Sequence, residues 1–177
     1  MERLAKNDYL SDESIASVAF LADRLAKPVL VEGPAGTGKT ALAKAVAAIR
    51  AQQIPMVFLT SNNTRELSEA LKRRCLYLYV GYPSVERERD IILARVPGIT
   101  TALAEQIAQV VRSLRNLDLK KAPSVSETLD WARTLVVLGR DEIGDADAAE
   151  TLHILLKYQS DIERATKELL GRPRPLA

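Results

Sequence analysis

The chain has 177 residues, 47% of them hydrophobic, and a formal net charge of +2 at pH 7; this composition excludes a disordered chain and gives little support to nucleic-acid binding. One cysteine, Cys75, and one histidine, His153, exclude an internal disulfide framework and argue against a zinc site of the usual ligands. No apolar run approaches the ~18 residues of a membrane span and the amino terminus is polar, so we expect a cytoplasmic protein.

The first elements of the chain are a helix and a short strand. Residues 1–11 are polar and are expected to be a loose lead-in. Apolar residues at helical spacing predict a helix over residues 11–27, with Ser11 or Asp12 as its cap. A proline ends this helix and opens a short apolar strand of buried type, residues 28–31.

A glycine-rich stretch follows this strand and precedes a run of strong helix formers that extends to about residue 50. It fits the pattern G-x-x-x-x-G-K-[ST] with Gly33, Pro34, Ala35, Gly36, Thr37, Gly38, Lys39 and Thr40. The order of strand, glycine loop and helix indicates a phosphate-binding P-loop rather than a glycine-rich turn that caps an ordinary helix. Successive backbone N–H groups would point at a phosphate, which the helix N-terminus also attracts. Lys39 would then bind the β- and γ-phosphates, and the Thr40 hydroxyl would ligate Mg²⁺.

A second strand is predicted over residues 54–60, where apolar residues follow one another without alternation. Such a run is typical of a parallel strand whose sheet is covered on both faces. The strand leads into Asn62 and Asn63, which either belong to a turn or lie at the carboxyl edge of the sheet, where ligands bind. A short helical piece is expected over residues 64–71 and a third strand over residues 75–80.

The rest of the chain is helical by pattern. The expected helices cover residues 84–96, 101–117, 124–138 and 145–170. The third begins at a capping box formed by Ser124 and Glu127, and Asp145 is the expected cap of the last. The layout is therefore a nucleotide-binding α/β part, residues 1–83, followed by a small all-α lid of four helices, residues 84–177.

Four features in a fixed order resemble the AAA+ ATPases: the P-loop, the apolar strand ending in Thr-Ser-Asn, the segment Leu-Ser-Glu-Ala-Leu-Lys-Arg-Arg, and the helical lid. The chain looks most like the MoxR-type group, in the branch associated with carbon monoxide dehydrogenase maturation. Residues 57–67 and 123–133 carry this finer resemblance. It implies a cytoplasmic ATPase that uses ATP and Mg²⁺, assembles as a homo-oligomeric ring, and assists metalloenzyme maturation with a von Willebrand A-domain partner.

The resemblance also implies roles for single residues. Asn62 matches sensor 1, the polar group that orients the attacking water. Arg74 matches the arginine finger that reaches into the neighbouring subunit's site, with Arg73 as the alternative and a basic surface turn as the plain interpretation of both. Ser126 stands where the family often has its sensor 2 arginine. Arg133 lies about two helical turns further on and either reaches phosphate or faces solvent.

One expected part is missing. AAA+ proteins carry a Walker B strand that ends in Asp-Glu between the P-loop helix and the sensor 1 strand. Only 21 residues, 41–61, separate Thr40 from Asn62, and none of them is acidic. Residues 136–142 imitate the motif superficially, but Gly-Arg interrupts them and we interpret them as a helix end. We therefore expect an internal deletion that leaves a three-stranded sheet in which the P-loop and sensor 1 strands are neighbours.

This deletion leaves enzymatic activity open, because both the acid that helps hold Mg²⁺ and the acid that activates water are absent. One alternative is a non-hydrolytic assembly module that uses nucleotide as structural glue. Another is a small P-loop kinase, which the length would suit. The amphipathic helices of the lid argue against the kinase.

Overall fold

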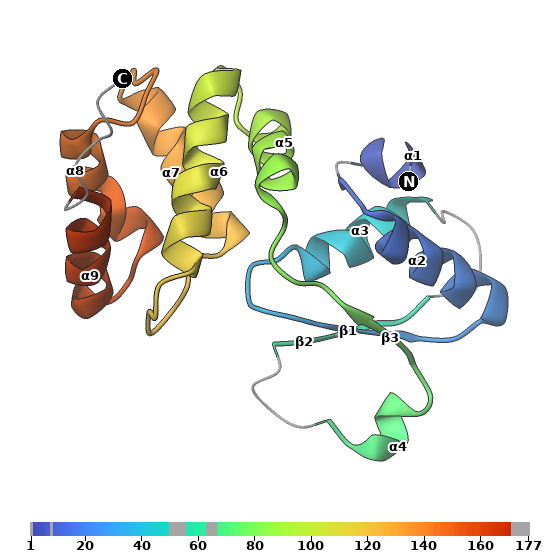
Figure 1. Ribbon diagram of the computed structural model, residues 1–177. Coiled ribbons are helices and arrows are strands. Elements are labelled where there is room, and N and C mark those ends of the chain that lie inside the picture. The colour runs from blue at the N-terminus through green and yellow to red at the C-terminus, as the bar shows by residue number, and fades with distance from the viewer. Residues whose placement is uncertain (1, 8, 50–55, 63–66, 171–177) are drawn as a thin grey trace. The chain divides into compact units, whose positions relative to one another are not determined.

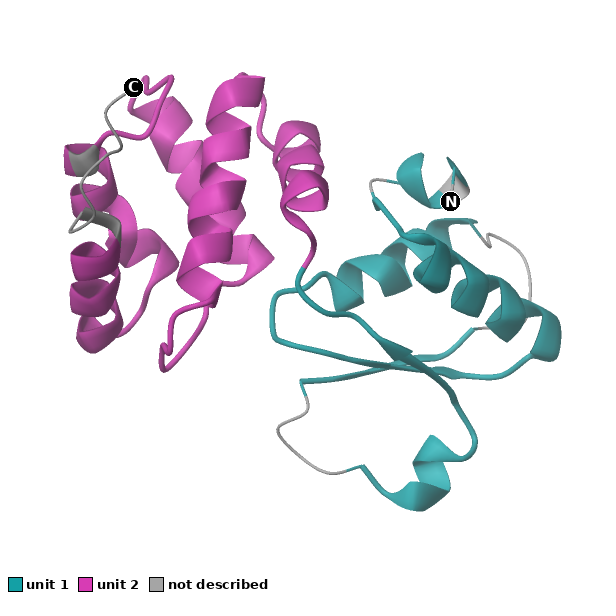
Figure 2. Ribbon diagram, in the orientation of Figure 1, with its two compact units in different colours: residues 1–82 teal, residues 83–177 magenta. Residues whose placement is uncertain are grey.

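The computed structural model describes residues 2–7, 9–49, 56–62 and 67–170. The chain divides into two compact units, Met1–Tyr82 and Pro83–Ala177 (Figure 2). The first, the α/β unit, contains a small parallel sheet with helices, and the second, the helical unit, has no strand among its described residues. The expected α/β class with a reduced parallel sheet is thus confirmed. No helix in the described part is both long enough and apolar enough to span a membrane.

Within the described residues, the sheet of the α/β unit has three strands, β1 (Val29–Glu32), β2 (Phe58–Ser61) and β3 (Leu76–Tyr79). Their order is β2-β1-β3 and both pairings are parallel. The central strand β1 is the one that leads into the glycine loop. Its neighbour β2 leads into Asn62, so the expected adjacency of these two strands is confirmed.

The helices that accompany the sheet in the described part of this unit (Figure 1) are α1 (Glu2–Ala5), α2 (Glu13–Leu25), α3 (Lys39–Ile49) and α4 (Glu69–Lys72). Of the two expected caps of α2, the structure uses Asp12, whose carboxylate accepts the Ile15 N–H at 2.8 Å. The helical piece expected over residues 64–71 is shorter in the described part. It starts after Ser68, while residues 64–66, like the first two residues of the strand expected over 54–60, lie outside the described residues.

The two faces of the sheet differ in cover. Val29 and Val31 belong to a buried cluster with Leu42 and Val46 of α3. Because side chains alternate along a strand, the neighbours of these valines point to the other face, where Tyr77 and Tyr79 of β3 are more than half exposed. The expectation of a sheet covered on both faces therefore holds for the described central strand β1, which is buried throughout, and is wrong for the described outer strands β2 and β3.

The position of β2 explains this error. Within the described part, β2 pairs only with β1, so it is an edge strand whose residues are half-buried or exposed. An apolar run without alternation is the pattern of an interior strand, but the 21 residues between Thr40 and Asn62 already hold most of α3 and all of β2. They leave no room for a further strand and crossover helix on the outer side.

The helical unit contains α5 (Val85–Arg95), α6 (Thr101–Arg115), α7 (Val125–Val137), α8 (Asp145–Leu155) and α9 (Gln159–Leu170). The hydroxyls of Ser84, Thr100 and Ser124 cap the first three of these helices. The predicted capping box of Ser124 with Glu127 is confirmed. The fully buried Trp131 lies in the core of this unit, and its indole N–H donates to the Thr151 hydroxyl at 2.7 Å.

The last helix expected from the sequence is two helices in the structure. Gly144, rather than Asp145, occupies the N-cap of α8 and makes no side-chain cap. After Leu155 the chain leaves the helix, because Leu156 is extended, and the Lys157 ammonium binds carbonyls in the last turn of α8. The carboxylate of Asp161 at the start of α9 accepts the N–H groups of Lys120 and Lys121, which lie 41 and 40 residues earlier in the chain. Hydrogen bonds between residues so far apart in the chain cannot be predicted from the spacing of apolar residues.

Candidate functional site

The glycine loop begins where two backbones come very close. The Val80 N–H donates to the Glu32 carbonyl at 2.7 Å, just after β3 and at the end of β1. Gly33 has φ +148°, and a Cβ at this position would lie 2.0 Å from the Val80 carbonyl oxygen. Only glycine fits such a contact and such a backbone. The loop's start is therefore fixed by the pairing of β1 with the chain beyond β3.

We expect Gly33→Ala to destabilise the α/β unit. The positive φ costs on the order of 1–3 kcal/mol for a residue with a Cβ, and the backbone of Val80 must also move. Gly38→Ala is the matched control, because Gly38 also has positive φ (+89°) but its Cβ would make only an ordinary 3.7 Å contact with Tyr9. Chemical denaturation should show a larger loss in the free energy of unfolding for Gly33→Ala than for Gly38→Ala. Equal losses would show that the approach to Val80 imposes no constraint.

The loop leads directly into the N-terminus of α3. The Leu42 N–H donates to the Gly38 carbonyl at 2.9 Å, so the helix is closed from its first turn. The N–H groups of the first helical residues, Lys39, Thr40 and Ala41, have no partner within a helix. Together with the helix dipole they favour an anion at this end. The exposed Thr40 lies at the same end.

The Lys39 side chain folds back over the loop. Its ammonium donates to the carbonyls of Gly33 at 2.8 Å and Pro34 at 2.6 Å, and the residue is only 6% exposed. Burial lowers the pKa of Lys39. The Thr37 hydroxyl donates to the same Pro34 carbonyl at 3.0 Å, which fixes the loop further. The loop thus holds the Lys39 ammonium by two neutral carbonyls. A charged phosphate oxygen is a stronger hydrogen-bond acceptor for this ammonium than a carbonyl is.

Asn62 lies at the same edge of the sheet as the loop. It follows β2 directly, and Ser61 is in register with Glu32, the last residue before Gly33. Its side chain is exposed. The structure therefore brings Asn62 to the edge where the glycine loop begins, while Asn63 lies outside the described residues.

Arg73 and Arg74 lie at the opposite edge. Both are exposed and precede β3, whereas the loop follows β1, and the two strands are parallel. A four-residue strand is about 13 Å long at ~3.3 Å per residue. The topology therefore separates Arg74 from the loop of its own chain.

The remaining sequence candidates lie in the helical unit. Ser126 and Arg133 are both exposed on α7, and Arg133 forms an ion pair with Asp130 at 2.9 Å. The interpretation of residues 136–142 as a helix end is confirmed. The helix α7 ends at Val137, and Gly139 follows in the left-handed conformation with φ +67°.

Two residues near the loop were missed by the sequence analysis. Glu32, at the end of β1, is 9% exposed, and it is the only carboxylate in β1, the glycine loop, α3, β2 or β3. Partial burial, followed by the charge and hydrogen bond of Glu32, raises the pKa of Tyr77. Glu32 could have been identified from the sequence, because it is a single acidic residue at the end of an apolar strand.

Tyr9 is the second missed residue. It is 8% exposed, and its ring lies 3.7 Å from the position of a Cβ on Gly38. Leu4 of α1 is buried as well. The described residues before Ser11 therefore pack beside the glycine loop and are not the loose lead-in that their polarity suggested.

The donor set of this site suits a phosphate-bound metal better than a protein-bound one. The described residues contain no group of three or more His, Cys, Asp or Glu side chains that could hold a metal ion. Thr40 offers one hydroxyl at the anion-binding end of α3, and Mg²⁺ commonly takes its other ligands from phosphates and water.

No model of a known protein family matches the chain, and no curated protein matches it either.

Proposed function

We propose that this protein binds ATP with Mg²⁺ at residues 33–40 and belongs with the AAA+-like P-loop proteins. The observation that carries the proposal is the buried Lys39 ammonium, held by the Gly33 and Pro34 carbonyls between the end of β1 and the start of α3. A glycine loop, an aimed lysine and a helix N-terminus together make a phosphate site.

Each part of the loop has a role in this proposal. The N–H groups at the start of α3 bind phosphate oxygens, and Lys39 exchanges its loop carbonyls for the β- and γ-phosphates. The Thr40 hydroxyl ligates Mg²⁺, which when bound neutralises phosphate charge. Asn62, at the same edge of the sheet, orients water near the γ-phosphate.

The wider role follows from the resemblance to MoxR-type proteins: assembly with copies of itself, promoted by ATP, and assistance to metalloenzyme maturation with a von Willebrand A-domain partner. The place of Arg74 supports assembly. It is exposed and at the far end of the sheet from its own loop, so an arginine finger at this position must serve a second copy.

A non-hydrolytic assembly module is the second candidate. It is favoured by the scarcity of carboxylates, since Glu32 is the only one in the three strands, the loop and α3. In that case ATP stabilises the assembly without being consumed.

Calorimetry with ATP and with ADP in the presence of Mg²⁺ tests the binding site. We expect weak binding to the wild type and none detectable to Lys39→Ala, a loss of at least about tenfold or ~1.4 kcal/mol. The control is Lys44→Ala, which removes an exposed lysine from the same helix and should bind as the wild type does. Unchanged affinity in Lys39→Ala would exclude the loop as the phosphate site.

A further inference from the structure

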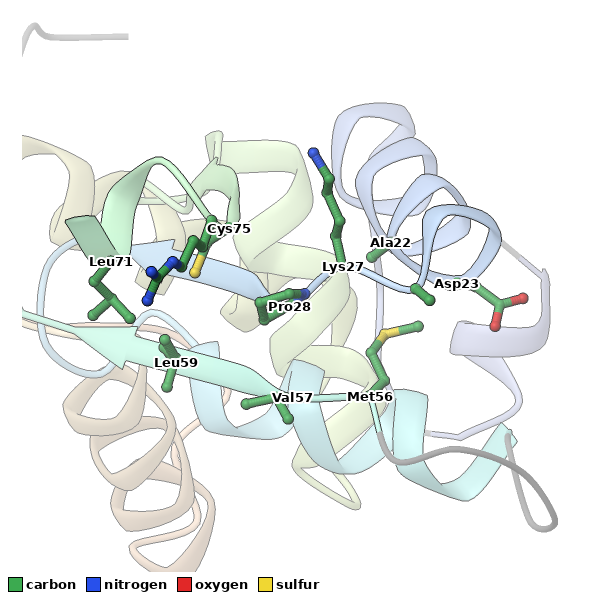
Figure 3. Close-up of a pocket in the computed structure, with 11 residues that line it drawn as sticks. Ala22, Asp23, Lys27, Pro28, Met56, Val57, Leu59, Leu71 and Cys75 are labelled. Atoms are coloured by element: carbon green, nitrogen blue, oxygen red, sulfur yellow. The ribbon is translucent and has the colours of Figure 1, made fainter. Parts of the chain in front are cut away.

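A pocket of about 380 Å³, whose lining residues Figure 3 shows, lies where β1 and β2 begin. The glycine loop follows the other end of β1, so the pocket and the loop are at opposite ends of the sheet. It is bounded by the last turn of α2, the start of β1, the residues that enter and form β2, and the turn after α4. Its wall is mostly apolar and includes Val57, Leu59 and Leu71. A cavity of this size and lining can hold two or three apolar groups of a ligand or of another protein.

Two cations line this pocket without a counter-ion in the described part of the chain. Lys27 and Arg74 are both exposed, and their side chains form no hydrogen bond or ion pair with the described residues. Asp23 is the one acid in the lining, and it already has an interaction within the chain. The pocket therefore suits a partner that presents apolar groups next to acidic ones.

The helical unit presents such a group at the end of α7, in residues 137–142, which we name the acidic corner. Val137 is 85% exposed, more than any other large hydrophobic side chain in the described part, and Leu138 is 48% exposed. Asp141 and Glu142 follow, both exposed and without an ion pair to described residues. The charge of Arg140 is compensated by Asp147 at 2.7 Å.

The acidic corner has a fixed shape. The Arg140 N–H donates to the Leu135 carbonyl at 2.9 Å, and the Gly139 N–H donates to the Val136 carbonyl at 3.0 Å. These two bonds, with Gly139 at φ +67°, are a Schellman motif, which ties the chain back onto the last turn of the helix. A preorganised apolar and acidic corner loses little conformational entropy when it docks.

We propose that the acidic corner of one copy docks into the pocket of a second copy. Val137 and Leu138 enter the apolar pocket, and Asp141 and Glu142 face its two cations. The two surfaces differ, so the contact is head-to-tail and produces a ring if the rotation closes. This rests on the self-assembly in the proposed function and not on nucleotide binding. It also places Arg74 at an interface between copies, where a finger must lie.

A charge exchange between two variants tests the docking. Lys27→Glu reverses the charge of one of the two pocket cations, and Arg74 is kept because it is the candidate finger. The double change Asp141→Lys with Glu142→Lys reverses the charge of the corner. In sedimentation velocity without nucleotide, each variant alone should associate at least about tenfold more weakly than the wild type. A mixture of the two should associate again, because the native corner of the first variant meets the native pocket of the second. The reversed corner of the second meets a pocket in which Lys27→Glu supplies an acid.

Further measurements distinguish this docking from association that depends on charge alone. Glu150→Lys, an exposed acid of α8 outside the corner, should associate as the wild type does. Val137→Asp should weaken association even in high salt, where charge pairs are screened. A monomeric wild type at high concentration, or a mixture that stays as dissociated as its components, would overturn the docking. Calorimetry with ATP on the same variants reports the P-loop separately, so loss of nucleotide binding and loss of docking are distinguishable.

Discussion

Arg115→Met is expected to destabilise the helical unit by about 3–5 kcal/mol, because it leaves a buried carboxylate without its partner. The side chains of Glu88 and Arg115 are 1% and 4% exposed. The guanidinium donates to both carboxylate oxygens, at 2.5 and 2.8 Å, and to the Pro123 carbonyl at 2.9 Å. The Thr128 hydroxyl donates to the same carboxylate at 3.0 Å. The ion pair therefore joins α5 to α6 in the core, and the hydrogen bond of Thr128 ties α7 to the same carboxylate.

The control for this change is Arg133→Met on α7. Its ion pair with Asp130 joins side chains that are 52% and 63% exposed, so its loss should cost no more than about 1 kcal/mol. Glu88→Leu combined with Arg115→Met should recover most of the stability, because it removes the unpaired charge as well. Chemical denaturation of the wild type, the two single variants and the double variant measures these differences in the free energy of unfolding. Arg115→Met costing no more than Arg133→Met would show that Glu88 finds other partners.

The features that the sequence predicted well are those whose cause is local. The glycine loop, the strand before it and the helix after it occupy consecutive residues. The spacing of the motif was therefore enough to place Gly33 after the strand and Lys39 and Thr40 at the start of the helix. Ser124 and Glu127 are three residues apart, so their capping box could also be read directly. The adjacency of β1 and β2 followed from a topological rule, since one helix joins neighbouring parallel strands.

The features that it missed depend on contacts between distant residues. Near the break between α8 and α9, Asp161 accepts hydrogen bonds from backbone N–H groups some 40 residues earlier. The helical spacing of apolar residues continues through this break, so the sequence pattern did not reveal it. The cover of a sheet face depends on which elements are present, so β2 has an interior pattern at an exposed edge. Tyr9 is polar in part and was assigned to a tail, but it is buried against the loop.

If the loop binds ATP as proposed, hydrolysis by this protein is still expected to be near background. Phosphate contacts hold the substrate in place, but attack by water also needs a base, which contributes typically ~10²–10⁴-fold or ~3–5 kcal/mol of barrier. Asn62 can orient water but cannot take its proton. Changing Arg74 should alter so low a rate very little.

Two insertion variants test the cause of this low rate. A strand and helix inserted between Ile49 and Met56, with the strand ending in Asp-Glu beside the outer edge of β2, should raise turnover by orders of magnitude. The same insertion ending in Asn-Gln is its control and should not raise it. Steady turnover near ~1 s⁻¹ in the wild type, lost in Lys39→Ala, would contradict the prediction. Glu32→Gln would then be decisive, because Glu32 is the one carboxylate in the strands, the loop and α3, and loss of that turnover would identify it as the base.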